Sequence, residues 1–151
     1  MSGNSFNRNP KNDTPNIDIF KGLTILVVDD LEDNLVLITF LLESYGIQVV
    51  AASNAKDGLE AIKQSPVDVL ISDINMPEED GYWLIHKIRS LTLPQKKDIP
   101  AIAITGHFGN QAREKALFAG FQTFLEKPLN LEQLIVEIAK LLKNSCKSIP
   151  A

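Results

Sequence analysis

The feature that most constrains the fold is a regular alternation of two hydrophobic patterns that begins near residue 23. Short apolar runs of the kind found in buried parallel strands occupy residues 24–28, 47–52, 67–72, 99–104 and 121–125. Helical patterns separate and follow these runs, and they occupy residues 32–45, 55–64, 82–91, 110–119 and 130–142. Residues 92–98 form a polar connection. The chain therefore predicts alternating strands and helices.

This alternation favours an α/β fold, a doubly wound five-stranded parallel sheet with helices on both faces. Right-handed crossovers place the carboxyl ends of all strands at one edge of such a sheet. We expect the flavodoxin-like strand order 2-1-3-4-5, in which the first and third strands flank the point where the order reverses and where ligands bind. Residues at the ends of these two strands are the first candidates for a functional site.

The length of 151 residues suits one domain that buries its core without disulfide bonds or metals. We expect the folded domain to span residues 22–143. Residues 1–21 are rich in Asn, Ser, Pro and Lys and predict a flexible leader, and residues 144–151 predict a short flexible tail.

The composition excludes several function classes. A net charge of -4 argues against sequence-independent binding to nucleic acid. Cys146 is the only cysteine, so no disulfide framework can form and a reducing compartment fits best. No apolar run is long enough to cross a bilayer, and residues 1–15 lack the apolar core of a signal peptide. We therefore expect a cytoplasmic protein without direct nucleic-acid binding or membrane insertion.

Charged and polar residues stand at the ends of the predicted strands. Asp29 and Asp30 follow the first strand, Asp73 the third, Thr105 the fourth and Lys127 the fifth. Carboxylates gathered at one edge repel one another unless a cation compensates, and hard oxygen ligands suit Mg²⁺ or Mn²⁺. Lys127 and Thr105 resemble a cradle for phosphoryl oxygens, and Asp73 is best placed as the nucleophile that forms an aspartyl phosphate.

The loop after Asp73 has the composition of a stiff turn. Pro77 fixes a φ angle, and Gly81 allows a backbone conformation that other residues resist. Taken singly, the strand-end residues have ordinary explanations, since Asp30 could cap the first helix and Lys127 could lie along the end of the sheet. Their joint occurrence at one edge favours a functional site.

From about residue 23 to residue 142 the chain resembles the receiver domain of two-component response regulators, of the single-domain kind similar to chemotaxis regulators. Four motifs in the same order support this: Val27-Val28-Asp29-Asp30, Asp73 with Met76-Pro77 and Asp80-Gly81, Thr105, and Lys127-Pro128. The resemblance implies that a histidine kinase or histidine phosphotransfer protein phosphorylates Asp73, and that phosphorylation switches a face that binds a downstream protein. It implies a phosphoacceptor that promotes its own phosphorylation and dephosphorylation, and not an enzyme.

The resemblance also implies a metal site. Mg²⁺, with Mn²⁺ as the alternative, would be held by Asp30, Asp73 and the backbone carbonyl of Asn75, with Asp29 acting mainly through water. No organic cofactor is implied.

Further roles follow from the same resemblance. Thr105 and Lys127 would bind the phosphoryl oxygens, and Thr105 with Phe124 would form the conformational switch. Asn75 and His107 occupy positions that tune the lifetime of the phosphate. The Lys127–Pro128 bond would be cis, which is affordable only before proline.

The sequence departs from the family at two positions. Trp83 stands where a small acidic or polar residue is common, and we expect it to pack near the start of its helix. Gly106 replaces the more usual alanine and should leave the site accessible. His86 and His107 are isolated from cysteines, which argues against a zinc site, and His86 is expected at the surface.

Other interpretations stay open. The chain could be the receiver of a hybrid histidine kinase or an intermediate in a phosphorelay, and a phosphorylation-linked homodimer is compatible with the family. An aspartyl-phosphate phosphohydrolase is less favoured, because such enzymes need a second acid two residues after the nucleophile and Asn75 cannot take that role. A receiver-like module that no longer takes phosphate is disfavoured because all the acids and the lysine are present.

Overall fold

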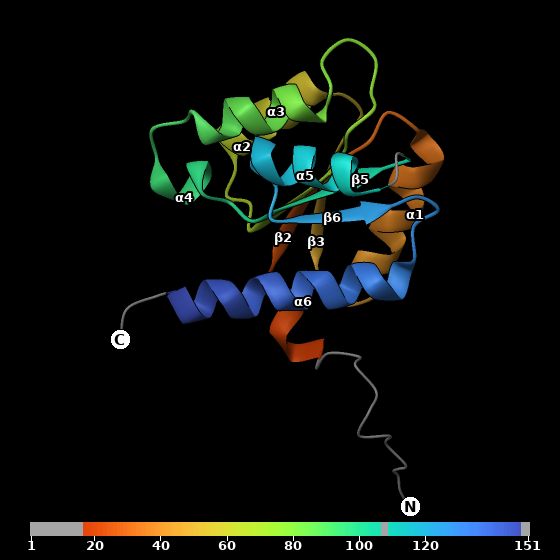
Figure 1. Cartoon of the computed structure of the whole chain (residues 1–151). Helices are drawn as coiled ribbons and strands as arrows, with labels where there is room; N and C mark the ends of the chain where they lie inside the picture. Colours follow the sequence, from red (N-terminus) through yellow and green to blue (C-terminus); the bar gives the residue numbers. More distant parts are fainter. Residues whose placement is uncertain (1–16, 107–108, 149–151) are drawn as a thin grey trace, which may run out of the picture.

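The computed structural model describes residues 17–106 and 109–148, which form a five-stranded parallel sheet (Figure 1). The strands lie in the order β3-β2-β4-β5-β6. Their bounds are β2 Thr24–Val28, β3 Gln48–Ala52, β4 Val69–Asp73, β5 Ala101–Thr105 and β6 Thr123–Glu126. Because β2 is the first strand along the chain, this is the order 2-1-3-4-5, and the predicted fold class is confirmed.

Helices cover both faces of the sheet (Figure 1). On one face lie η1 (Ile17–Phe20), α1 (Glu32–Glu43) and α6 (Leu131–Ser148). On the other face lie α2 (Ala55–Gln64), α3 (Gly81–Arg89) and α5 (Asn110–Ala119), and the short α4 (Pro94–Lys97) precedes β5. Within the described residues, no helix combines the length and the apolar character that crossing a membrane requires.

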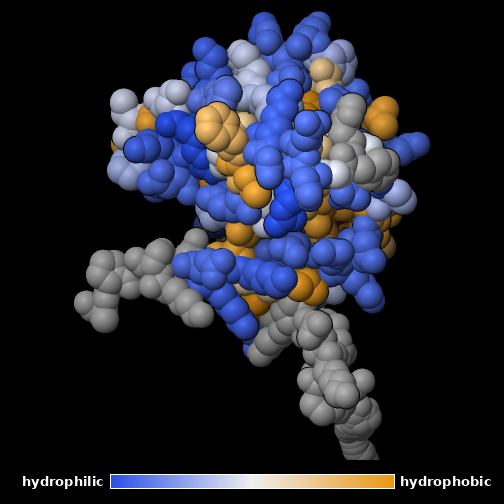
Figure 2. Space-filling view, viewed as in Figure 1, coloured by the Kyte–Doolittle hydropathy of each residue, from blue (hydrophilic) through white to orange (hydrophobic). Residues whose placement is uncertain are grey.

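Side chains of each strand alternate between two hydrophobic cores. In β2, Ile25 and Val27 pack in the core with α1 and α6, whereas Leu26 and Val28 pack in the core with α2 and α3. This follows from the two-residue period of a strand. In Figure 2, α6 shows a hydrophilic outer side with apolar side chains between it and the rest of the domain. The sheet is therefore buried on both faces, as its uninterrupted apolar strands predict.

The strands that carry site residues end later than the sequence predicts. Asp73 and Thr105 are the last residues of β4 and β5, and they pair with Ile104 and Glu126 of the neighbouring strands. Because the ladder is formed by backbone groups, a polar side chain does not by itself end a strand. The functional side chains are therefore fixed by sheet hydrogen bonds up to their own positions.

The folded part of the chain begins before residue 22, which was the predicted boundary. Residues Ile17–Phe20 form a 3₁₀ turn, and Phe20 is fully buried. Its ring meets Tyr45 edge to face, with 5.4 Å between the ring centres. The Phe20 ring therefore anchors η1 to the core, although the composition of residues 1–21 is mostly polar. The part of the predicted leader over 1–16 lies outside the described residues.

The last helix begins as predicted and ends later. The Asn130 side chain caps α6 by accepting a hydrogen bond of 3.0 Å from the Gln133 N–H. The helix continues to Ser148, through residues that were predicted as part of the tail. Residues 143–148 contain neither glycine nor proline, and Pro150 is the first strong stop signal after residue 130.

Arg89, at the end of α3, joins three segments of the chain. Its guanidinium donates two hydrogen bonds to the Gly120 carbonyl, of 3.1 and 2.7 Å, and one of 2.7 Å to each of the Lys97 and Ile99 carbonyls. It also donates to the Gln122 side chain. A planar group with five donors suits such a site. No motif in the sequence identifies this role.

We predict that Phe20→Ala lowers the free energy of unfolding by about 3–5 kcal/mol, because it removes a fully buried ring. The control is Ile19→Ala, whose side chain is 41% exposed and should change stability by no more than about 0.5 kcal/mol. Urea denaturation followed by circular dichroism measures both. Equal effects would show that η1 is not part of the core.

We predict that Arg89→Met lowers the free energy of unfolding by about 2–3 kcal/mol, since the Gly120, Lys97 and Ile99 carbonyls lose their donors. Arg113→Met, at an exposed position of α5, should change it by less than about 0.5 kcal/mol. Chemical denaturation of the two variants tests this, and an Arg89 variant as stable as the Arg113 variant would contradict it.

Candidate functional site

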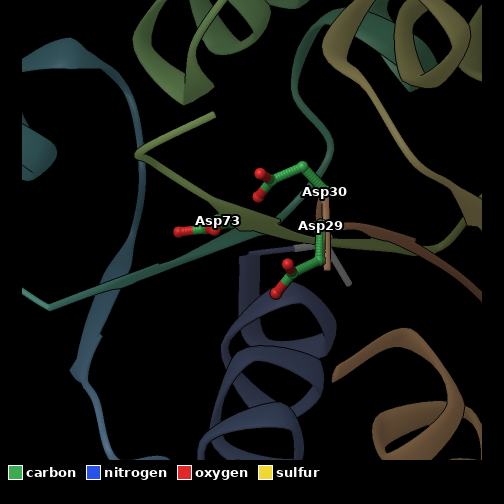
Figure 3. Close-up of side chains that lie close together, drawn as sticks. All are labelled: Asp29, Asp30 and Asp73. Atoms are coloured by element: carbon green, nitrogen blue, oxygen red, sulfur yellow. The ribbon is translucent and has the colours of Figure 1, made fainter. Parts of the chain in front are cut away.

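The predicted cluster of carboxylates is present at the carboxyl edge of the sheet. Asp29 and Asp30 follow β2, Asp73 ends β4, and these two strands are neighbours. Figure 3 shows the three side chains close together, and one oxygen from each lies within 4.8 Å of the others. Asp29 and Asp73 are only 2% exposed. The fold therefore concentrates negative charge at the point where the strand order reverses.

Asp73 is held by the distant Lys127 side chain and by the backbone of the loop that follows Asp73. The Lys127 ammonium, just after β6, lies 3.2 Å from Asp73 Oδ2 and donates a hydrogen bond to it. The Asn75 N–H donates to Asp73 Oδ1 at 3.3 Å. The Asn75 side chain also donates to Thr105 Oγ, at 3.4 Å. The structure thus brings together the residues that the sequence predicts as nucleophile and phosphoryl cradle.

The electrostatics of this arrangement favour a bound cation. Burial raises the pKa of Asp73, and the negative charge of Asp29 raises it further. Lys127 and the Asn75 N–H act in the opposite direction, but the net effect is a pKa above the ordinary value for aspartic acid. The protein's own donors therefore do not fully stabilise the charge of Asp73. A set of oxygen ligands with uncompensated negative charge fits Mg²⁺ or Mn²⁺.

Asp29 is fixed by the start of α1. Its Oδ1 accepts a hydrogen bond of 2.9 Å from the Leu31 N–H, and its Oδ2 accepts one of 3.2 Å from the Asn34 side chain. The residue at the N-cap of α1 is Leu31, which makes no side-chain cap. Asp30 is therefore not the helix cap, and this ordinary explanation of the acidic pair is wrong. Sequence reasoning missed Asn34, whose only signal is its place in the first turn of the helix that follows the acids.

Gly81 is required at its position for a different reason from the one predicted. Its φ angle is not positive; instead, a Cβ there would lie 2.6 Å from the Asp73 carbonyl oxygen and 2.8 Å from Ile74 Cα. The residue with a positive φ in this loop is Glu78, at 66°. Asp80 caps α3 by accepting from the Trp83 N–H at 2.9 Å. Gly81 thus lets α3 start directly against the end of β4.

The residues expected to form the switch lie on the neighbouring strands. Thr105 is 3% and Phe124 is 8% exposed, and the Phe124 ring packs in the core beside α3 and α5. Phe124 also lines an open pocket of about 560 Å³ between α5, β6 and α6, together with Arg113 and Gln133. The Lys127–Pro128 bond is cis, as predicted.

Three of the four remaining predicted positions lie within the described residues. Trp83 packs half-buried against the core on the α3 side, and Lys87 Nζ lies 5.6 Å from the centre of its ring, so the predicted packing is confirmed. His86 is exposed, as expected. Gly106 is exposed, and an added Cβ would meet no atom within 4 Å. His107 lies outside the described residues.

Comparison with known proteins agrees with this fold and this set of residues. Residues 25–139 match the response regulator receiver domain, and the chain belongs to this family. Over 128 residues it is 38% identical to an uncharacterized 14.6 kDa protein of Leptolyngbya boryana, a match that covers 85% of this chain and 93% of the relative. As a receiver domain, the chain is a component of two-component signalling, in which receivers interact with histidine kinases or phosphotransfer proteins.

The family also includes parts of larger proteins. The chain is 37% identical over 112 residues to the signal transduction histidine-protein kinase BarA of Escherichia coli K12, which covers 74% of this chain but 12% of that kinase. A CheY-like response regulator receiver domain protein from Methanospirillum hungatei JF-1 has a structure that matches with a TM-score of 0.76 at 27% identity. That match covers 84% of this chain and 98% of the other.

We predict that Asp73→Asn raises the free energy of unfolding at pH 7 in buffer with a metal chelator. The folded-state pKa of Asp73 lies above its unfolded value of about 3.9, so the wild type loses stability as the pH rises through the interval between the two values. Asparagine has no charge to bury. The stabilisation should therefore be complete above the folded-state pKa and vanish below about pH 3.9.

Urea denaturation at a series of pH values measures this difference. Asp33→Asn, which removes an exposed carboxylate from the first turn of α1, is the control. A destabilised Asp73→Asn variant at neutral pH would show that Lys127 outweighs burial and the repulsion from Asp29.

Proposed function

We propose that this chain accepts a phosphoryl group on Asp73 from a histidine kinase or phosphotransfer protein, as a cytoplasmic response regulator in a two-component or phosphorelay system. The observation that carries the proposal is the contact of 3.2 Å between Lys127 Nζ and Asp73 Oδ2, beside the Asp29 and Asp30 carboxylates. A nucleophile, a cation for the transferred charge and a cluster of acids are the parts that phosphoryl transfer needs.

The proposed transfer is a single displacement at phosphorus. An Asp73 carboxylate oxygen forms the new O–P bond while the N–P bond of a phosphohistidine breaks, and the electron pair of that bond returns to the imidazole nitrogen. Lys127 and the Thr105 hydroxyl donate hydrogen bonds to the phosphoryl oxygens and stabilise their charge. In the structure, the Lys127 ammonium donates to the Asp73 carboxylate. During the proposed transfer, this ammonium would shift from the carboxylate to the phosphoryl oxygens.

The acidic cluster would hold the metal ion. Asp30, Asp73 and the Asn75 carbonyl are the direct ligands we propose, with Asp29 acting through water. Bound Mg²⁺ supplies positive charge to the phosphoryl oxygens. The raised pKa of Asp73 supports this assignment, because the site lacks sufficient positive charge of its own.

Signalling would follow from a shift between two populations. Thr105 is drawn toward the phosphoryl group, and Phe124 occupies the space beneath it, so the face formed by α5, β6 and α6 changes its affinity for a downstream protein. Both side chains are buried on adjacent strands, which supports their coupling. The same face could also pair two copies of the chain after phosphorylation. Asn75 and His107 would set the lifetime of the phosphate by controlling access of water.

A second candidate is the receiver of a hybrid kinase or phosphorelay. It is favoured by the similarity to histidine kinases such as BarA, of which the chain spans about an eighth. The chemistry at Asp73 is the same in both cases. A phosphohydrolase is disfavoured because Asn75, two residues after the nucleophile, is an amide that donates to Thr105 and cannot act as an acid.

Incubation with Mg²⁺ and acetyl phosphate, followed by intact mass measurement, tests the proposal. We expect a mass increase of one phosphoryl group in the wild type and none in Asp73→Asn, which keeps the shape of the side chain. Lys127→Met should reduce the rate by at least about tenfold, because removing one transition-state donor commonly costs more than that. An equal mass increase in wild type and Asp73→Asn would contradict the assignment of Asp73.

A further inference from the structure

The three carboxylates of the site are held to different degrees. Both oxygens of Asp29 accept hydrogen bonds, from the Leu31 N–H and from Asn34 Nδ2. Asp73 accepts from Lys127 and from the Asn75 N–H. Asp30 is half-buried, and no hydrogen bond or ion pair reaches its carboxylate from the described residues. Within the described residues, Asp29 and Asp73 are therefore each held at both oxygens, whereas Asp30 is not.

Of the two hydrogen bonds to Asp29, the one from Asn34 comes from a side chain and not from the local backbone. The Leu31 N–H lies two residues after Asp29 and forms an Asx-type turn, which fixes one oxygen only. Asn34 lies five residues after Asp29, in the first turn of α1, and it fixes the second oxygen. A carboxylate held at both oxygens has a defined plane, whereas one held at a single oxygen can turn about its Cβ–Cγ bond.

We propose that Asn34 is a positioning residue of the metal site, which orients Asp29 so that its charge and its remaining lone pairs face the cation. This inference rests on the proposed function, since it assigns a role in the same acidic cluster. Hydrogen bonds to the outer side of a carboxylate commonly orient it for a metal and tune its affinity. The amide of Asn34 also places a partial positive charge beside a buried carboxylate that repels Asp73.

The surroundings of Asn34 make the role testable, because the side chain can be changed without disrupting the core. Asn34 is half-buried and lines a pocket of about 280 Å³ that also reaches Asp29, Leu37, Lys127 and Pro128. Leucine has nearly the shape of asparagine and would lie beside apolar groups there. Asn34→Leu therefore removes the donor while keeping the number and branching of the side-chain atoms.

The test measures the affinity of the unphosphorylated chain for Mn²⁺, from the electron paramagnetic resonance signal of the free ion. We expect Asn34→Leu to weaken binding by about tenfold, and Asn34→Gln, which keeps an amide donor, to recover most of the loss. Thr39→Val is the matched control, because it removes a polar group from the same helix and lines a different pocket. Its Mn²⁺ affinity should equal that of the wild type.

Unfolding of each variant in chelator shows whether the fold is intact. A folded Asn34→Leu variant with wild-type Mn²⁺ affinity overturns the inference, and so does a loss shared equally with Thr39→Val. A wild type that does not bind Mn²⁺ overturns the metal site and this inference together. A wild type that binds Mn²⁺ but is not phosphorylated by acetyl phosphate contradicts the phosphoacceptor function alone.

Discussion

Repulsion among three carboxylates at one edge of the sheet is the constraint on which the site depends. The parallel order places the ends of β2 and β4 side by side. This brings together the carboxylates of Asp29, Asp30 and Asp73. Burial strengthens the repulsion because little water screens it. The surrounding groups partly compensate this charge. Lys127, just after β6, forms an ion pair with Asp73. The Leu31 N–H and the Asn34 amide, at the start of α1, donate hydrogen bonds to Asp29.

The sequence allowed the fold and most of the site to be predicted because both depend on repeating rules. Apolar strands with helices between them specify a parallel sheet, and each strand end then delivers its residue to a known edge. The contributions of Phe20, Asn34 and Arg89 could not be predicted in this way. Each acts through one contact between segments that no periodic pattern links. Gly81 shows a related limit, since its glycine is needed for close packing against the Asp73 carbonyl and not for its φ angle.

The helices on the face of the sheet that carries α2, α3 and α5 do not bury equal amounts of apolar surface. Four residues of α3 are buried, namely Gly81, Leu84, Ile85 and Ile88, whereas the buried residue of α5 is Ala116. Phe118 of α5 is 96% exposed. A helix that buries little apolar surface costs little to displace. Of these two helices, α5 therefore costs less free energy to displace from the core.

Arg89 fixes one end of α5. Its guanidinium donates two hydrogen bonds to the carbonyl of Gly120, which directly follows α5. These bonds connect the C-terminal end of α5 to the end of α3. With that end held, a displacement of α5 in the proposed switch would be a rotation about Gly120. In the proposed switch, a displacement that starts at Thr105 would therefore be largest near Asn110 and Arg113, which border the pocket beside Phe124. The exposed Phe118 lies close to the pivot, so it would travel least and would present nearly the same surface in both states.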